Sequence, residues 1–128
     1  MLDGLAVLIV EDDFLIALTL ADAVEEAGGS VIGPASTTTV ALGLLALERV
    51  RAAILDVNLA DRDIEPVLNE CMTGHIPTVV HSATGLSPLL AKLYPQVPVL
   101  LKPQVPDAVV LALADVVARG WPDHLAVQ

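Results

Sequence analysis

Five short apolar runs, separated by segments with helical spacing, constrain the fold of this chain more than any other feature. The runs are five or six residues long and lie at residues 5–10, 30–34, 52–56, 77–81 and 97–101. Apolar runs of this length are typical of strands buried on both faces of a sheet, and strands that alternate with helices form βαβ units. The sequence therefore predicts an α/β fold with a doubly wound, five-stranded parallel sheet between two layers of helices.

Helical spacing and end signals place a helix after each strand. Apolar residues recur at helical spacing from Ala17 to Gly28, where a Gly-Gly pair marks the helix end. The other predicted helices cover residues 38–51, 64–73, 86–93 and 107–119. One face of the last helix is apolar, and Val110, Leu111 and Ala114 remain apolar on another face. This surplus indicates either a deeply buried helix or a surface for a partner or a dimer.

Composition narrows the range of functions. The 128 residues predict a single domain, with a core of about residues 5–119 and a short tail at 120–128. A net charge of −10 with only six Lys plus Arg leaves no basic stripe for nucleic acid. Cys71 is the one cysteine and can form no internal disulfide, and no apolar run approaches the length of a membrane span. We expect a cytoplasmic protein without a signal peptide.

Polar residues with distinct chemistry follow four of the five predicted strands. The acids Glu11-Asp12-Asp13 (residues 11–13) follow the first strand, and Asp56 ends the third. Ser82 follows the fourth strand and Lys102 the fifth. Because ligands of such sheets bind beyond the carboxyl ends of the strands, these residues are predicted to meet at one edge.

This set of side chains is typical of phosphoryl transfer. Clustered carboxylates repel one another unless a cation binds between them, and their oxygens suit Mg²⁺. A lysine neutralises phosphate oxygens, and a hydroxyl donates one more hydrogen bond. Each residue also has a simpler interpretation: Asp13 could cap the first helix, and Ser82 could be an ordinary strand end. The four strand ends together favour the functional interpretation.

Four segments resemble those of response-regulator receiver domains of two-component signalling. They are residues 7–13, 54–59, 80–83 and 101–103, within a resemblance that spans about residues 5–119. The resemblance implies a flavodoxin-like receiver fold, with strand order 2-1-3-4-5 and three layers.

The resemblance also implies a role for each residue at the strand ends. Asp56 would be the phosphoacceptor of a phosphoprotein, with Ser82 in the hydroxyl position and Lys102 in the lysine position, joined to Pro103 by a cis peptide. The ligands implied for Mg²⁺ (or Mn²⁺) are Glu11, Asp12, Asp56 and the backbone carbonyl of Asn58.

Two departures from the family pattern concern the usual output face. Receiver domains usually have Tyr or Phe three residues before the lysine, but Val99 stands there. The fourth helix is weak and interrupted by proline, between Gly85 and Tyr94, and resembles that of a receiver subgroup in which this helix is reduced.

The resemblance implies a phosphoacceptor signalling domain and not an enzyme beyond its own Mg²⁺-dependent phosphorylation and dephosphorylation. The phosphoryl donor would be a phosphohistidine of a sensor histidine kinase or a histidine phosphotransferase. We expect no output domain of its own, so that the signal leaves through protein contacts, with a homodimer through the last helix and its neighbours as one possibility. The chain could also be a fragment of a longer protein.

Three other functions stay open on the sequence. An unphosphorylated receiver-like interaction module is favoured only by Val99. A phosphatase with an aspartate nucleophile would need an acid where Asn58 stands. A flavin-binding protein of similar fold would need a phosphate-cradling loop after the first strand, where residues 11–13 would repel the phosphate.

Overall fold

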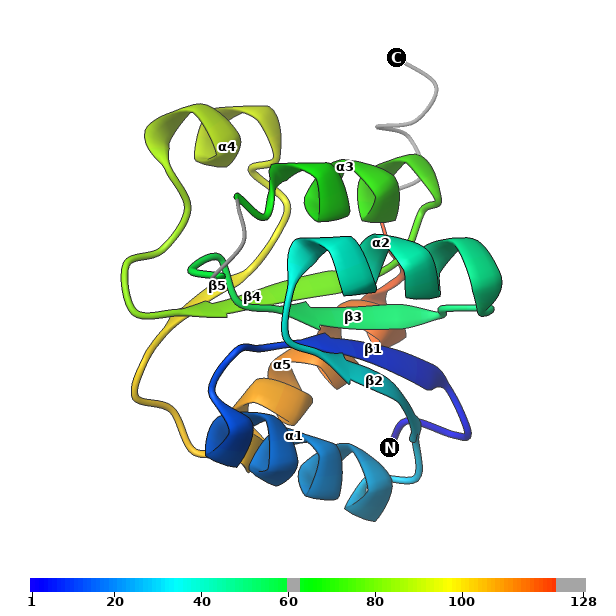
Figure 1. Cartoon of the computed structure of the whole chain (residues 1–128). Helices are drawn as coiled ribbons and strands as arrows, with labels where there is room; N and C mark the ends of the chain where they lie inside the picture. The colour runs from blue at the N-terminus through cyan, green and yellow to red at the C-terminus, as the bar shows by residue number, and fades with distance from the viewer. Residues whose placement is uncertain (60–62, 122–128) are drawn as a thin grey trace.

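The computed structural model describes residues 1–59 and 63–121, and the predicted tail beyond residue 121 lies outside the described residues. A five-stranded parallel sheet with the order β2-β1-β3-β4-β5 forms its centre (Figure 1). The strands are β1 (Ala6–Val10), β2 (Ser30–Ala35), β3 (Ala52–Leu55), β4 (Thr78–Ser82) and β5 (Val99–Leu101). The helices are α1 (Phe14–Glu26), α2 (Thr38–Leu47), α3 (Glu65–Thr73), α4 (Pro88–Leu93) and α5 (Pro106–Arg119). The predicted α/β class and strand order are confirmed.

Two apolar clusters, one on each face of the sheet, hold the three layers together. Successive side chains of a strand point to opposite faces, so Val7 and Ile9 of β1 belong to one cluster, whereas Leu8 and Val10 belong to the other. Helices α1 and α5 pack on the first face, and α2, α3 and α4 pack on the second (Figure 1). Continuous apolar runs were required because both faces are covered.

The second helix ends earlier than predicted, at Leu47 instead of Arg51. Arg51, just before β3, is already hydrogen-bonded to the sheet, because its backbone N–H donates to the carbonyl of Ala6 at 2.9 Å. Val50 is buried against the face covered by α2 and α3. The last four residues of the predicted helix therefore form the connection that brings the chain down onto the sheet.

The apolar surplus of the last helix is mostly core. Val110 is 2 % exposed, because α1 as well as the sheet packs against α5, whereas Leu111 is 60 % exposed. The deeply buried interpretation is correct for Val110, and only Leu111 of the pair faces solvent. The fourth helix is short, as predicted, and has six residues. Ser87 is its N-cap, because the Ser87 hydroxyl accepts a hydrogen bond from the backbone N–H of Leu90.

None of the helices in the described part of the chain is long and apolar enough to cross a membrane. Cys71 is buried in the cluster under α3, where burial raises the pKa of its thiol to about 12. A thiol protonated at neutral pH in an apolar cluster acts as a packing residue.

Candidate functional site

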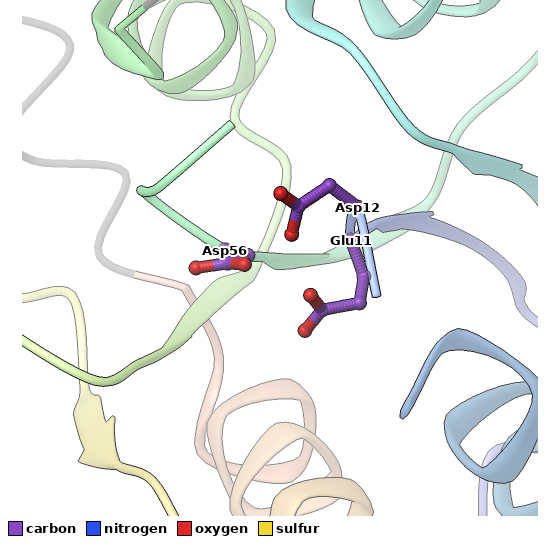
Figure 2. A group of neighbouring side chains, drawn as sticks. All are labelled: Glu11, Asp12 and Asp56. Atoms are coloured by element: carbon purple, nitrogen blue, oxygen red, sulfur yellow. The ribbon is translucent and has the colours of Figure 1, made fainter. Parts of the chain in front are cut away.

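Three carboxylates meet at the carboxyl edge of the sheet. Glu11 and Asp12 follow β1, and Asp56 follows β3, the neighbouring strand. The backbone N–H of Asp56 donates to the carbonyl of Val10 at 2.8 Å, which holds the two strand ends level. One oxygen of each carboxylate lies within 4.8 Å of the others, and the side chains point toward the same space (Figure 2). The predicted convergence of these acids is confirmed.

The third acid of the triplet has a different role. Asp13 is the N-cap of α1, and its Oδ1 accepts hydrogen bonds from the backbone N–H groups of Leu15 at 3.0 Å and Ile16 at 3.2 Å. A cap of this kind satisfies backbone donors that have no partner within the helix. The structure thus separates one helix-capping acid, as predicted, from two acids that face Asp56.

Lys102 reaches into the acidic cluster from β5. Its Nζ lies 3.0 Å from Oε1 of Glu11 and 3.3 Å from Oδ2 of Asp56. The angle of the shorter contact is not that of a hydrogen bond, so it is an ion pair only. Burial alone would lower the pKa of Lys102, but the two carboxylates outweigh burial and raise it. The ammonium is therefore a fixed positive charge beside Asp56, and the peptide to Pro103 is cis, as predicted.

Glu11 shows that the cluster holds more negative charge than one lysine neutralises. Burial, followed by the neighbouring carboxyl group of Asp56, raises the pKa of Glu11 to about 7. Near neutral pH, the carboxylate of Glu11 therefore carries a proton for part of the time. A divalent cation would remove this repulsion, and oxygen ligands at this spacing are those that Mg²⁺ prefers. The residues present therefore fit a Mg²⁺ ion.

Two further polar side chains border the site. Asn58 donates its backbone N–H to Oδ1 of Asp56 at 3.1 Å and its side-chain amide to Oγ1 of Thr84 at 3.3 Å. Ser82 is fully buried, and its Oγ accepts from the backbone N–H of Thr84 at 3.2 Å. Thr84 was missed in the sequence, where only the polar Ser-Ala-Thr-Gly run after β4 indicated it. The link between Asn58 and Thr84 joins the loops that follow β3 and β4.

No family model matches the chain, and no curated protein matches it. Solved structures do. SdrG from Sphingomonas melonis Fr1 shares 32 % identity at a TM-score of 0.76, over 91 % of this chain and 99 % of that one. A response regulator receiver protein from Sinorhizobium medicae WSM419 shares 18 % identity at a TM-score of 0.77, over 92 % and 98 %. A CheY-like receiver domain protein from Methanospirillum hungatei JF-1 has the same identity and TM-score, over 91 % and 95 %.

The receiver proteins from Sinorhizobium medicae and Methanospirillum hungatei share this fold over nearly their whole length. SdrG shares the fold and also has a similar sequence. The chain belongs to the response-regulator receiver domains. In this receiver domain, Val99 occupies the position on β5 where receiver domains usually have an aromatic ring. Its side chain is small and apolar, and the residue is 39 % exposed.

A hollow of ≈ 620 Å³ opens beside the acids of the receiver domain. Asp12, Asn58 and Thr84 line it next to the carboxylates, and Leu86 and Leu90 line the part under α4. The hollow is open to solvent and lies between the loop after β3 and the segment from Thr84 to α4. The wall of the hollow next to the acidic cluster is therefore polar, whereas the wall formed by Leu86 and Leu90 is apolar.

The raised pKa of Glu11 predicts that Mg²⁺ binding depends on pH. Below about pH 7 the metal-free receiver keeps a proton on Glu11, and a Mg²⁺ ion that binds Glu11 would have to displace it. We expect the affinity for Mg²⁺ to fall by up to about tenfold per pH unit below 7 and to level off above it. Calorimetric titrations between pH 5.5 and 8.5 measure this. Glu11→Gln should weaken binding and flatten the profile, whereas a wild-type affinity that is constant below pH 7 contradicts the assignment.

The same proton has the opposite effect on the metal-free fold. Glu11 has a higher pKa in the folded than in the unfolded chain, so its proton stabilises the fold at low pH. That contribution is complete below the ordinary pKa of glutamate and is lost as the pH rises through about 7. Metal-free thermal stability should therefore decline between about pH 5 and pH 8.

Proposed function

We propose that this receiver domain accepts a phosphoryl group on Asp56 from a phosphohistidine of a sensor histidine kinase or histidine phosphotransferase. The observation that carries the proposal is the position of Lys102, whose ammonium lies 3.3 Å from Oδ2 of Asp56 within a group of three carboxylates. A nucleophile, a fixed cation and a set of metal ligands are the parts that phosphoryl transfer requires. The protein would act as a phosphoacceptor in signalling.

In the proposed reaction, a carboxylate oxygen of Asp56 forms a bond to phosphorus. The phosphorus–nitrogen bond of the donor breaks at the same time, and its electron pair stays on the histidine nitrogen. Lys102 balances charge on the phosphoryl oxygens from one side. Ser82 can donate its hydroxyl hydrogen to one of them, since its Oγ accepts only from the backbone of Thr84 among the described residues.

The ligands proposed for Mg²⁺, or Mn²⁺ in its place, are the carboxylates of Glu11, Asp12 and Asp56 and the backbone carbonyl of Asn58. When bound, the ion would neutralise the remaining phosphoryl oxygens and orient the donor. Asp12 is exposed at the wall of the hollow beside the site, so it can reach an ion there without leaving its own position. Glu11 is buried and would bind directly or through water.

Intact mass tests the proposed function. The chain is incubated with acetyl phosphate, with and without Mg²⁺, and we expect one added phosphoryl group per chain in the presence of the ion only. Phosphoaspartate is an acyl phosphate, so hydroxylamine should remove the added mass. A chain that gains no mass from acetyl phosphate or from any phosphohistidine donor contradicts the proposal.

The proposed route for the signal is a protein contact through α5 and its neighbours, as a homodimer or with another partner. Leu111 is the exposed apolar residue of the surplus on α5, and Val105 precedes the helix at 67 % exposure. We expect Leu111→Glu to weaken association by about tenfold or more, because it places a charge in an apolar contact. Sedimentation with and without acetyl phosphate measures this.

The matched control is Asp115→Ala, which alters an exposed residue of the same helix that pairs with Arg119. Association that is equal in wild type and Leu111→Glu removes α5 from the contact and leaves phosphorylation of Asp56 untouched.

A further inference from the structure

His81 is a buried imidazole beside the site whose two ring nitrogens both lack a hydrogen-bond partner among the described residues. The residue lies in β4 and is 4 % exposed. Buried polar groups nearly always have a partner, and leaving one unpaired destabilises the fold. An apolar residue would fill this strand position without that cost. The sequence indicated only a structural histidine inside an apolar strand.

Strand alternation places His81 on the same face of the sheet as the charged side chains of the site. Val79 of β4 belongs to the cluster under α1 and α5, and His81, two residues on, points to the same face. Leu55 of β3 pairs with Val80, so Asp56 and His81 are level neighbours on adjacent strands. Glu11 and Asp56 reach this face by the same alternation, from Ile9 and Ile54 of that cluster.

The side chain of Lys102 spans the end of β4 on the face of the sheet that carries His81. Lys102 follows β5, and its Nζ lies beside Asp56 of β3 and Glu11 of β1. In the sheet order β1-β3-β4-β5, β4 is the strand between Lys102 and Asp56. His81 is the residue of β4 that is level with Asp56 on this face. The imidazole therefore lies beside the route of the lysine side chain, close enough for the charge of Lys102 to act on it.

The imidazole can offer the ammonium a hydrogen-bond acceptor. A neutral imidazole always has one nitrogen that accepts and one that donates. Burial, followed by the positive charge of Lys102, lowers the pKa of His81, which favours this neutral form at pH 7. The ammonium of Lys102 has three N–H donors, and in the described structure it contacts the carboxylates of Glu11 and Asp56. One donor of the ammonium and one acceptor of the imidazole are thus both available.

We propose that His81 is a positioning residue for Lys102: a ring nitrogen accepts a hydrogen bond from the ammonium once Glu11 turns from Lys102 to the metal. The proposal rests on the proposed function, because Glu11 has to leave Lys102 only if it binds Mg²⁺ for phosphoryl transfer. Without a replacement partner, the ammonium would lose one of its two carboxylate contacts when it has to face the phosphoryl oxygens. His81 holds Nζ over Asp56 in that state.

A pair of substitutions separates this role from a merely structural one. His81→Leu removes both unpaired nitrogens, and we expect it to raise the melting temperature and to slow phosphorylation by acetyl phosphate by about tenfold. His81→Gln keeps an acceptor, and we expect a rate within about threefold of wild type. A structural histidine predicts instead that both variants react as fast as wild type. His75→Asn, which alters an exposed histidine with positive φ at the opposite end of β4, is the control.

Nitrogen chemical shifts of the imidazole test the contact without phosphorylation or metal. Glu11→Ala removes the same carboxylate contact from Lys102, so the accepting nitrogen of His81 should show the shift of a newly formed hydrogen bond. Glu11→Ala combined with Lys102→Met should return the unbonded shift. If the His81 nitrogens are the same in wild type and Glu11→Ala, the proposal is overturned.

The two measurements fail independently. If the wild-type chain gains no phosphoryl group, the proposed function is wrong, and the chemical shifts alone then decide whether His81 bonds Lys102. If the chain is phosphorylated and His81→Leu reacts at the wild-type rate, the positioning role is wrong and the proposed function stands.

Discussion

Asp56→Asn should abolish phosphorylation of this receiver domain. The amide has nearly the size of the carboxylate but lacks the nucleophilic oxygen. No phosphoryl group can therefore be added at this position beside Lys102. We expect the intact mass to be unchanged after incubation with acetyl phosphate and Mg²⁺. The fold should persist, because the substitution also removes one of the carboxylates that repel one another at the buried site. Metal-free thermal stability should be equal to or above that of wild type.

The control for this variant is Asp13→Asn. Asp13 lies in the same acidic segment but caps α1, and asparagine caps a helix about as well as aspartate. It should gain the phosphoryl group at the wild-type rate. If Asp56→Asn still gains one phosphoryl mass, the acceptor is another residue and the assignment of Asp56 is wrong.

Asp12→Ala should weaken Mg²⁺ binding by about tenfold or more, because even groups that only support a metal ligand contribute that much to affinity. Asp12 has one oxygen in the group of three carboxylates and lies exposed at the wall of the hollow. Calorimetric titration at pH 8 measures the affinity while Glu11 is ionised. Phosphorylation by acetyl phosphate should slow in parallel and recover in part at high Mg²⁺ concentration.

Asp22→Ala provides the comparison for Asp12→Ala. It removes an exposed acid of α1 that lies outside the carboxylate group. It therefore takes away one negative charge, as Asp12→Ala does, and should leave the affinity within about twofold of wild type. Equal affinities in wild type and Asp12→Ala would remove Asp12 from the set of ligands, and Asp56 would then have to bind the ion with Glu11 and Asn58.

The sequence alone determined the fold and the location of the site. Apolar runs with helical segments between them can bury both faces of a sheet only in a parallel arrangement, and this brings every strand's carboxyl end to one edge. The convergence of Glu11, Asp12, Asp56 and Lys102 follows from that geometry, since each lies one or two residues beyond the end of a strand. Asp13 was also predictable as the cap of α1, because an acid just before a helical pattern has backbone donors within reach.

Tertiary structure decided what depends on packing between segments far apart in the chain. The end of α2 depends on where the chain must descend to pair with β1, and the burial of Val110 depends on α1 lying against α5. The link from Asn58 to Thr84 joins two loops whose separation no local pattern encodes.

The electrostatics of the site also belong to the tertiary structure. The pKa of Glu11 reaches about 7 only because burial and Asp56 act on it together. The relation of His81 to Lys102 requires the strand order and the face of β4, since the lysine reaches Asp56 by crossing the intervening strand. Local propensities act over a few residues, whereas desolvation and charge act through space, and only the folded chain sets those distances.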